Sequence, residues 1–276
     1  MNAGVVEEVP VPHGRLTVET TGGPGAGTVA LVHAGVADRR SWDGVVPALA
    51  ERYRVVTHDL RGFGDSPPPS APYSDAEDLL AVLEAAGAGP TFLVGNSYGG
   101  RVALEAAGLA PERVAGLALL AAPLPDHDWS AAVAGYADAE EAALERGDLD
   151  LAVSLNLDMW VRGPVRSWDA ALRGHAAAVR EAVRVSLVNQ HLTDRHGVSA
   201  LPELLDGLGG WDVPTLVAHG EADVPDFRVI AERLAGAIPG ARLRALAGVG
   251  HLIPVEQPAT TAALLLDFLA ERGRAG

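Results

Sequence analysis

The chain of 276 residues contains no cysteine and no lysine, so all 21 of its basic residues are arginines. Without cysteine the protein has no disulfide framework, no thiolate nucleophile and no cysteine-ligated zinc or iron–sulfur cluster. Without lysine it has neither a Schiff-base amine nor the lysine of a phosphate-binding loop. These absences exclude several large classes of enzyme.

Positive charge is scarce, and long hydrophobic runs are absent. The formal net charge is −15, and because phosphate binding needs a basic surface, we predict no nucleic-acid partner. The most apolar run, from Val114 to Pro125, is too short to span a bilayer and contains two prolines. Residues 1–14 lack the basic start and the apolar stretch of a signal peptide. We therefore predict a cytoplasmic protein with no membrane partner.

Apolar residues, by contrast, make up 48% of the chain, which is enough for one large core. Short apolar runs alternate with helical patterns, which is typical of a mainly parallel sheet. The predicted helices are Ser41–Glu51 with Ser41 as N-cap, Ser74–Ala86, Tyr98–Leu109, Asp226–Ala237 and Pro258–Arg272. The predicted strands are Val5–Val9, Arg15–Thr20, Thr28–His33, Tyr53–Asp59, Thr91–Gly95, Val114–Ala121, Pro214–His219 and Arg242–Leu246. We expect the first two strands to be antiparallel and joined through Pro10, Pro12 and Gly14.

The alternation of strands and helices stops at Pro123 and returns near residue 209. From 124 to 208 we find no convincing strand, only stretches rich in alanine, leucine and glutamate that are broken near Gly147, Gly163 and Gly174. We therefore predict a core made of residues 1–123 and 209–276 and a helical insert, residues 124–208, between two halves of one sheet.

The strongest chemical signal is the segment Gly95-Asn96-Ser97-Tyr98-Gly99-Gly100, between a predicted strand and a predicted helix. A serine on so tight a turn has crowded neighbours, so small residues two positions before and after it are a steric requirement. The turn exposes the serine hydroxyl above the sheet and directs the start of the next helix at developing negative charge. The alternative is an ordinary glycine-rich turn, since the chain holds 32 glycines.

A serine hydroxyl is a poor nucleophile unless a base removes its proton. Among the nine histidines, His251 follows the last predicted strand on a loop that could reach Ser97. Asp223 follows the preceding strand, where a carboxylate could hold the imidazole in the required tautomer. Three other acids compete with Asp223 for this role, namely Glu221, Asp226 and Asp126.

These residues give the chain a resemblance to the α/β-hydrolases that extends over nearly its whole length. In that superfamily the order along the chain is nucleophile, acid and histidine, and Ser97, Asp223 and His251 follow it. The resemblance implies an α/β-hydrolase fold, with a mainly parallel eight-stranded sheet flanked by helices. It also identifies the insert as a cap domain, which in this family covers the active site and shapes the substrate pocket.

Two further segments are similar to family motifs. Leu31-Val-His33-Ala-Gly35 resembles the His-Gly segment after the third strand, which implies an oxyanion hole made of the backbone N–H groups of Gly35 and Tyr98. Ala34 departs from the pattern, because the family usually has glycine there. The segment from Asp59 to Ser66 is similar to the family's Asp-x-Arg-Gly-x-Gly-x-Ser turn, which we interpret as scaffold.

The resemblance also separates this chain from some relatives. Haloalkane dehalogenases and epoxide hydrolases carry an aspartate where this chain has Ser97, and hydroxynitrile lyases use a lysine. We expect a substrate pocket lined by His33 and by three residues of the insert, Trp129, Met159 and Trp160. The run Asp126-His127-Asp128 has the residue types of a metal site but no matching cluster, so we interpret it as a solvated cap entrance.

The resemblance therefore implies a serine esterase that cleaves a small, apolar ester or lactone through an acyl-enzyme. It also implies that the reaction needs no cofactor and no metal. Two alternatives keep the same catalytic triad, since relatives cleave carbon–carbon bonds or form peracids and act as cofactor-free haloperoxidases. An alternative of another class is a pocket that binds a small molecule without converting it, as the hormone receptors of this fold do. The oligomeric state stays open, a homodimer included, because both caps and outer helices dimerise in this fold.

Overall fold

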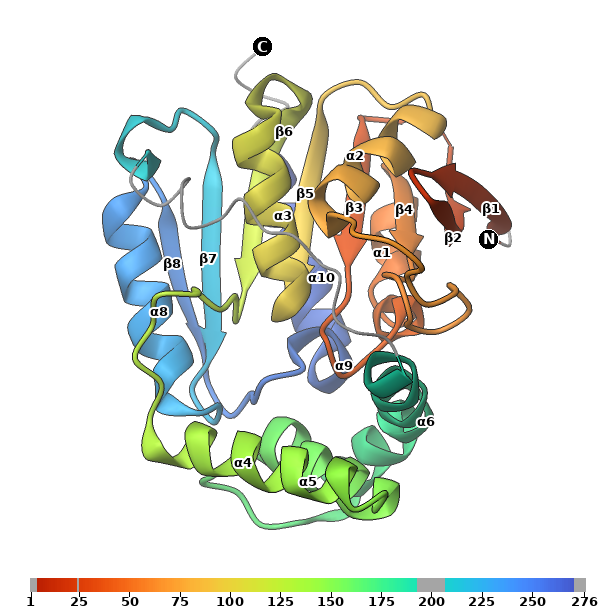
Figure 1. The fold of residues 1–276 in the computed structure, drawn as a ribbon. Coiled ribbons are helices and arrows are strands. Elements are labelled where there is room, and N and C mark those ends of the chain that lie inside the picture. The colour runs from red at the N-terminus through yellow and green to blue at the C-terminus, as the bar shows by residue number, and fades with distance from the viewer. Residues whose placement is uncertain (1–3, 24, 193–206, 271–276) are drawn as a thin grey trace.

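A computed structural model describes residues 4–23, 25–192 and 207–270 (Figure 1). Its centre is one eight-stranded sheet in the order β1-β2-β4-β3-β5-β6-β7-β8. β2 pairs antiparallel with β1 and β4, and every other pair is parallel. The strands are β1 Val5–Val11, β2 Gly14–Thr21, β3 Thr28–Val32, β4 Arg54–His58, β5 Thr91–Asn96, β6 Val114–Leu120, β7 Thr215–Gly220 and β8 Arg242–Leu246. The predicted fold class and all eight strands are confirmed.

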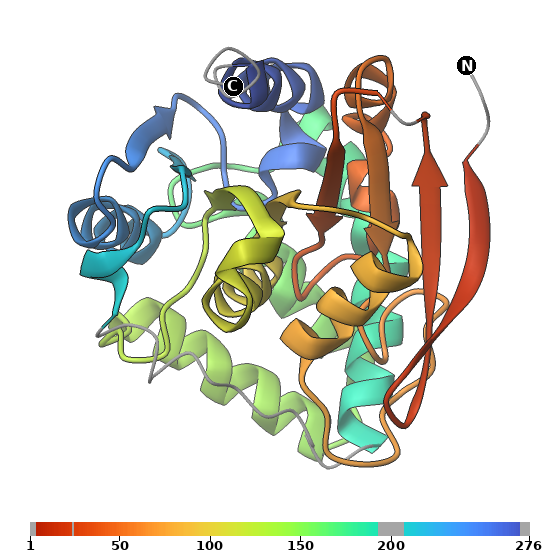
Figure 2. The same cartoon turned by 90° about the horizontal axis from the view of Figure 1, so that it is seen from above.

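Helices cover both faces of this sheet. Figure 2 shows α1 and α10 on one face and α2 and α3 on the other, while α8 packs against β7 and β8. The covering helices are α1 Val46–Ala50, α2 Asp75–Ala85, α3 Tyr98–Leu109, α8 Pro225–Ala237 and α10 Pro258–Ala270. Short helical turns lie at Arg39–Trp42 (η1), Pro111–Arg113 (η2), Leu208–Gly210 (η4) and Ile253–Glu256 (α9). Because both faces are covered, every residue of β5 and all but Ala115 of β6 are buried.

Two details at the start of the chain differ from the prediction. Pro10 lies inside β1 opposite Arg15 and not in the connection, because β1 is an edge strand, where a missing N–H is tolerated. The predicted helix Ser41–Glu51 is divided into η1 and α1, and the N-cap of η1 is Asp38, not Ser41. The break falls near Gly44, where a Cβ would stand 2.7 Å from that of Pro258. The position therefore needs glycine, which is a poor residue for a helix interior.

The segment between β6 and β7 is helical in its described residues. It contains α4 Ala131–Glu145, α5 Leu149–Leu157, the π-helical turn η3 Asp158–Arg162 and α6 Ala170–Leu192, with no strand among the described residues from 124 to 208. The predicted breaks at Gly147 and Gly163 occur, but Gly174 lies inside α6. A side chain at position 174 would meet nothing within 4 Å. Gly174 therefore lies on an open face of α6, and the helix continues on both sides of it.

The insert lies across the carboxyl ends of the parallel strands (Figure 1). An apolar cluster joins the two, because Ala34, Ala37 and Leu252 of the core pack with Val153 and Val183 of the insert. Loops that follow the strands therefore come to lie between the sheet and the insert. Within the described ranges, no helix is both long and apolar enough to cross a membrane.

We predict that Leu93→Ala strongly destabilises the protein. Leu93 is fully buried on β5, at the middle of the sheet, and removing its side chain should cost about 2–5 kcal/mol of unfolding free energy. Leu109→Ala is the matched control, because Leu109 on α3 is 44% exposed. Urea denaturation of the two variants measures the difference, and equal losses would contradict the placement of Leu93 in the core.

Candidate active site

Ser97 stands on a sharp turn between β5 and α3, with φ 54° and ψ −123°. Its neighbours have no room for side chains. A Cβ on Gly99 would stand 2.5 Å from the carbonyl oxygen of His33, and one on Gly100 would stand 2.7 Å from the Cβ of Ala122. A Cβ on Gly95 would collide with the backbone of Gly99. The glycines of this segment are therefore required by the close packing of β5, α3 and β3.

The structure brings Ser97, His251 and Asp223 together. The Nε2 of His251 lies 2.7 Å from the Oγ of Ser97, and its Nδ1 lies 2.8 Å from Oδ2 of Asp223. His251 is 3% exposed and Asp223 is 5% exposed, whereas Ser97 is partly open. One imidazole thus connects a hydroxyl to a buried carboxylate, which is the arrangement that activates a serine for nucleophilic attack.

Side-chain and backbone hydrogen bonds hold the loops that carry these groups. The side-chain amide of Asn96, next to Ser97, donates to the backbone carbonyl of His251 at 3.1 Å and to that of Leu120 at 3.0 Å. The other carboxylate oxygen of Asp223 accepts the backbone N–H of Val224 at 2.7 Å. These hydrogen bonds therefore hold the loops of Ser97, His251 and Asp223 in place.

The competing acids occupy other places. Glu221 is exposed. Asp226 accepts hydrogen bonds from the backbone N–H and the hydroxyl of Ser130 and lies 3.1 Å from His127 Nε2. Asp126 pairs with Arg233. These contacts connect the beginning of the insert to α8, and they also account for the Asp126-His127-Asp128 run, whose first two side chains bind partners on α8.

Gly35 and Tyr98, whose backbone N–H groups are the predicted oxyanion donors, lie close together. A Cβ on Gly35 would stand 3.5 Å from the Cβ of Tyr98. Tyr98 is the first residue of α3, so its N–H has no acceptor within the helix. Ala34, which replaces the usual glycine, keeps a negative φ, since only His13, Ser97 and Ala121 have a positive φ among the described non-glycine residues. Alanine therefore fits the backbone at this position.

His33 does not have the pocket position that the sequence predicted for it. It is fully buried, its Nδ1 donates to the carbonyl of Ala34 at 2.8 Å, and its Nε2 accepts the N–H of Leu60 at 3.0 Å. Burial lowers its pKa, which keeps the ring neutral and suits this donor–acceptor pair. His33 therefore has no free group for a substrate, and it acts as a brace between the Gly35 loop and the loop after β4.

Aromatic rings surround the imidazole of His251. The ring of Trp160 lies 4.7 Å from it and that of Phe227 4.4 Å, measured between centroids. Trp129 contacts Phe227 at 5.7 Å, one ring further away, and Met159 packs on the main core. Trp160 and Phe227 thus lie beside His251, and the sequence analysis missed Phe227. Its position four residues after Asp223, at the start of the next helix, is the signal that could have found it.

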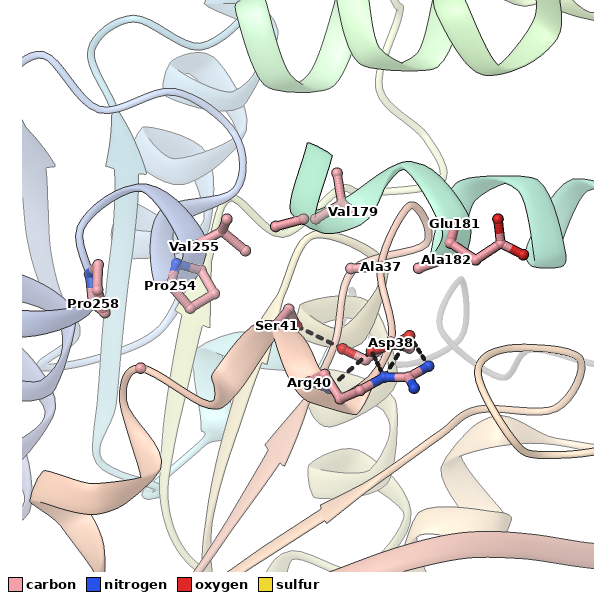
Figure 3. Close-up of a pocket in the computed structure, with 12 residues that line it drawn as sticks. Ala37, Asp38, Arg40, Ser41, Val179, Glu181, Ala182, Pro254, Val255 and Pro258 are labelled. Carbon is pink, nitrogen blue, oxygen red and sulfur yellow. Dashed lines mark hydrogen bonds and ion pairs between the residues drawn. The ribbon is translucent and has the colours of Figure 1, made fainter. Parts of the chain in front are cut away.

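One described pocket lies near this region but outside the row of three residues. It has a volume of about 430 Å³ and lies between η1, α6 and α9 (Figure 3). Its charged residues include Asp38 and Arg40, which are paired with each other. Ser97 and His251 are not among its lining residues, so it is a groove at the outer join of insert and core.

The buried carboxyl group of Asp75 binds the side chain of Tyr98. The hydroxyl of Tyr98 donates to Oδ2 of Asp75 at 2.7 Å. Burial raises the pKa of Asp75 to about 7, and the neighbouring Asp78 and Glu105 act in the same direction, whereas the Tyr98 hydrogen bond and Arg61 oppose it. In the unfolded chain an aspartate ionises near pH 3.8, so between these two values the folded state binds more protons.

We therefore predict that Asp75→Asn becomes more stable relative to the unsubstituted protein as the pH rises. The contribution of Asp75 to the free energy of unfolding is complete below about pH 4 and is lost as the pH rises to about 7, because its pKa is higher in the folded state than in the unfolded chain. Asparagine does not ionise, so the relative gain from pH 4 to 8 should reach roughly 4 kcal/mol at most. Urea denaturation at several pH values measures it, with exposed Asp128→Asn as control. A constant difference between Asp75→Asn and the unsubstituted protein would contradict the prediction.

Known proteins resemble this chain in sequence and in structure. A family model described as alpha/beta hydrolase fold matches residues 27–258. The 2-hydroxymuconate semialdehyde hydrolase of Pseudomonas sp. (strain CF600) is 31% identical over 259 residues, which cover 90% of this chain and 88% of that protein. The solved structure of carboxylesterase CesB from Bacillus subtilis is 20% identical, with a TM-score of 0.78 over 98% of this chain and 93% of that one. Est816, described as an N-acyl homoserine lactone degrading enzyme, is 26% identical, with a TM-score of 0.75 over 95% of this chain and 100% of that one.

Proposed function

Because this chain belongs to the α/β-hydrolase fold family, we propose that it is a serine hydrolase that cleaves a small, apolar carboxylic ester or lactone. The observation that carries the proposal is the hydrogen-bonded row of Ser97, His251 and Asp223, with contacts of 2.7 and 2.8 Å. A hydroxyl, an imidazole and a buried carboxylate in this order form a catalytic triad.

In the proposed reaction Ser97 Oγ attacks the carbonyl carbon while His251 Nε2 takes the hydroxyl proton. Asp223 keeps Nδ1 protonated and stabilises the charged imidazolium. The carbonyl oxygen becomes an oxyanion, which the N–H groups of Gly35 and Tyr98 bind at the start of α3. His251 then gives its proton to the leaving alcohol oxygen, and an acyl group stays on Ser97. Water, deprotonated by His251, releases the acid and restores the hydroxyl.

We further propose that residues 124–208 act as a cap over a core made of residues 1–123 and 209–276. The position of α4, α5 and α6 across the carboxyl ends of the strands supports this division (Figure 1). The rings of Trp160 and Phe227 beside His251 favour an apolar acyl or alcohol group, because they offer dispersion contacts and few hydrogen-bond partners. We also propose that Met159 and Trp129 line the outer part of the substrate site around His251.

The similar proteins support two kinds of scissile bond. Est816 is named for a lactone, which agrees with the ester or lactone proposal. The Pseudomonas relative is named for a semialdehyde, which favours carbon–carbon bond hydrolysis as the second candidate. The same nucleophile, base and oxyanion donors serve both reactions, so a panel of esters, lactones and β-diketone-like compounds separates them by which compounds turn over.

We expect Ser97→Ala to abolish turnover of p-nitrophenyl butyrate, lowering kcat by a factor on the order of 10³ or more. The reason is that alanine has no oxygen to form the acyl-enzyme. Ser154→Ala is the matched control, since Ser154 lies on the exposed side of α5 and should keep full activity. Unchanged thermal unfolding shows that the fold is intact. Full residual activity in Ser97→Ala would end the proposal.

Covalent labelling separates catalysis from simple binding. A fluorophosphonate probe should phosphonylate Ser97 in the native protein and leave the Ser97→Ala variant unlabelled, because only an activated hydroxyl reacts. Absence of label on the native protein would instead favour a ligand-binding member of the fold. Bromination of an acceptor in hydrogen peroxide, acetate and bromide, without ester turnover, would favour the cofactor-free haloperoxidase.

A further inference from the structure

One short stretch of the insert contacts both loops that carry His251 and Asp223. Trp160 in η3 lies against the His251 ring. Gly163, with φ 72°, lies so close to the Asp223 loop that a Cβ would stand 2.8 Å from the carbonyl oxygen of Ala222. A π-helical turn such as η3 is rare and frequently marks a functional site. The stretch from Trp160 to Arg166 therefore borders the loops that carry both residues.

Arg166, at the end of this stretch, reaches into the loop that precedes His251. Its guanidinium forms a two-pronged ion pair with Glu256 of α9, at 2.5 Å between Nη1 and Oε2 and 3.3 Å between Nη2 and Oε1. It also donates to the carbonyls of Val161 and Arg162 at 2.8 Å each. The side chains of Arg166 and Glu256 are only 17% and 5% exposed, so this pair is largely shielded from water.

Glu256 in turn holds the residue next to His251. Its Oε2 accepts the backbone N–H of Gly250 at 3.0 Å. A Cβ on Gly250 would stand 2.7 Å from Oε1 of Glu256 and closer still to Arg166, so only glycine allows this packing. The contacts form a chain from Arg166 in the insert through Glu256 to the backbone of Gly250 and then to His251.

We propose that Arg166 and Glu256 are positioning residues that fix the His251 loop and make the geometry of the catalytic base depend on the insert. This inference rests on the proposed function, because it gives the insert a part in catalysis besides covering the substrate. Fixing matters here because the imidazole must stay within hydrogen-bond distance of Ser97 and Asp223 at once, and small displacements of such groups are costly.

A second ion pair attaches the insert to the core away from the His251 loop. Asp126 binds Arg233 of α8 at 2.9 Å, with both side chains nearly half exposed. This pair holds the beginning of the insert to the core but contacts neither Gly250 nor Glu256. Arg233→Met therefore serves as a matched control that removes an arginine between insert and core without touching the His251 loop.

The test compares Arg166→Met, Arg166→Lys, Glu256→Gln and Arg233→Met in the full chain with p-nitrophenyl butyrate. We expect Arg166→Met to lower kcat by a factor on the order of 10 to 100, with KM changed about twofold or less. Arg166→Lys should recover part of the loss, because an ammonium group can pair with Glu256 but lacks the planar fork. Glu256→Gln should lower kcat in the same direction, and Arg233→Met should leave it unchanged.

Hydrogen–deuterium exchange gives a readout that needs no turnover. Peptides that span residues 248–256 should exchange faster in Arg166→Met and Glu256→Gln than in Arg233→Met, since the Gly250 N–H loses its fixed acceptor. The proposal is overturned if kcat stays within twofold in Arg166→Met, or in Glu256→Gln where Arg166→Met does not fold. It is also overturned if KM rises as much as kcat falls, or if exchange of the loop is unchanged. Loss of activity in Ser97→Ala with full activity in Arg166→Met would reject this inference and leave the proposed function standing.

Discussion

The imidazole of His251 is the group on which the site depends, because it alone contacts both of the other side chains. The hydrogen bond to Ser97 joins residues 154 positions apart, and the one to Asp223 spans 28. Such contacts form only because β5, β7 and β8 are parallel in this part of the sheet, so the loops that follow them emerge at one edge. The near-complete burial of His251 and Asp223 strengthens the bond between them by excluding water.

The price of this arrangement is local strain at Ser97. A non-glycine residue with φ 54° costs on the order of 1–3 kcal/mol, and it persists only when its surroundings determine it. Here the N–H of Ser97 donates to Leu120 at 2.8 Å, and the glycines on either side allow α3 to approach β5 and β3. Hydrogen bonds and close packing therefore hold Ser97 in its strained conformation, in which the hydroxyl points at His251.

Much of this arrangement was predictable from the sequence, for a definable reason. The strands follow from apolar runs and the Ser97 turn from glycine spacing, because backbone sterics act over a few residues. What failed depended on partners distant in the sequence. Gly44, near the break in the predicted helix, packs against Pro258, and His33 is buried with both of its ring nitrogens hydrogen-bonded, to Ala34 and to Leu60. Phe227 belongs to no motif, and its place in the first turn of α8, four residues after Asp223, is the one local sign of its contact with His251.

Asp223 and Asp226, which both follow β7, have different partners although they lie near the start of the same helix. Asp223 precedes α8 on the loop and faces the sheet edge, where His251 lies. Asp226 is already in the first turn of α8, where the helix dipole favours a negative charge, and it faces the insert, where Ser130 and His127 bind it. The two carboxylates are thus only three positions apart in the chain, but one faces His251 and the other faces the insert. Since Arg166, in the middle of the insert, binds Glu256 a few residues after His251, the insert contacts the core both at α8 and beside His251.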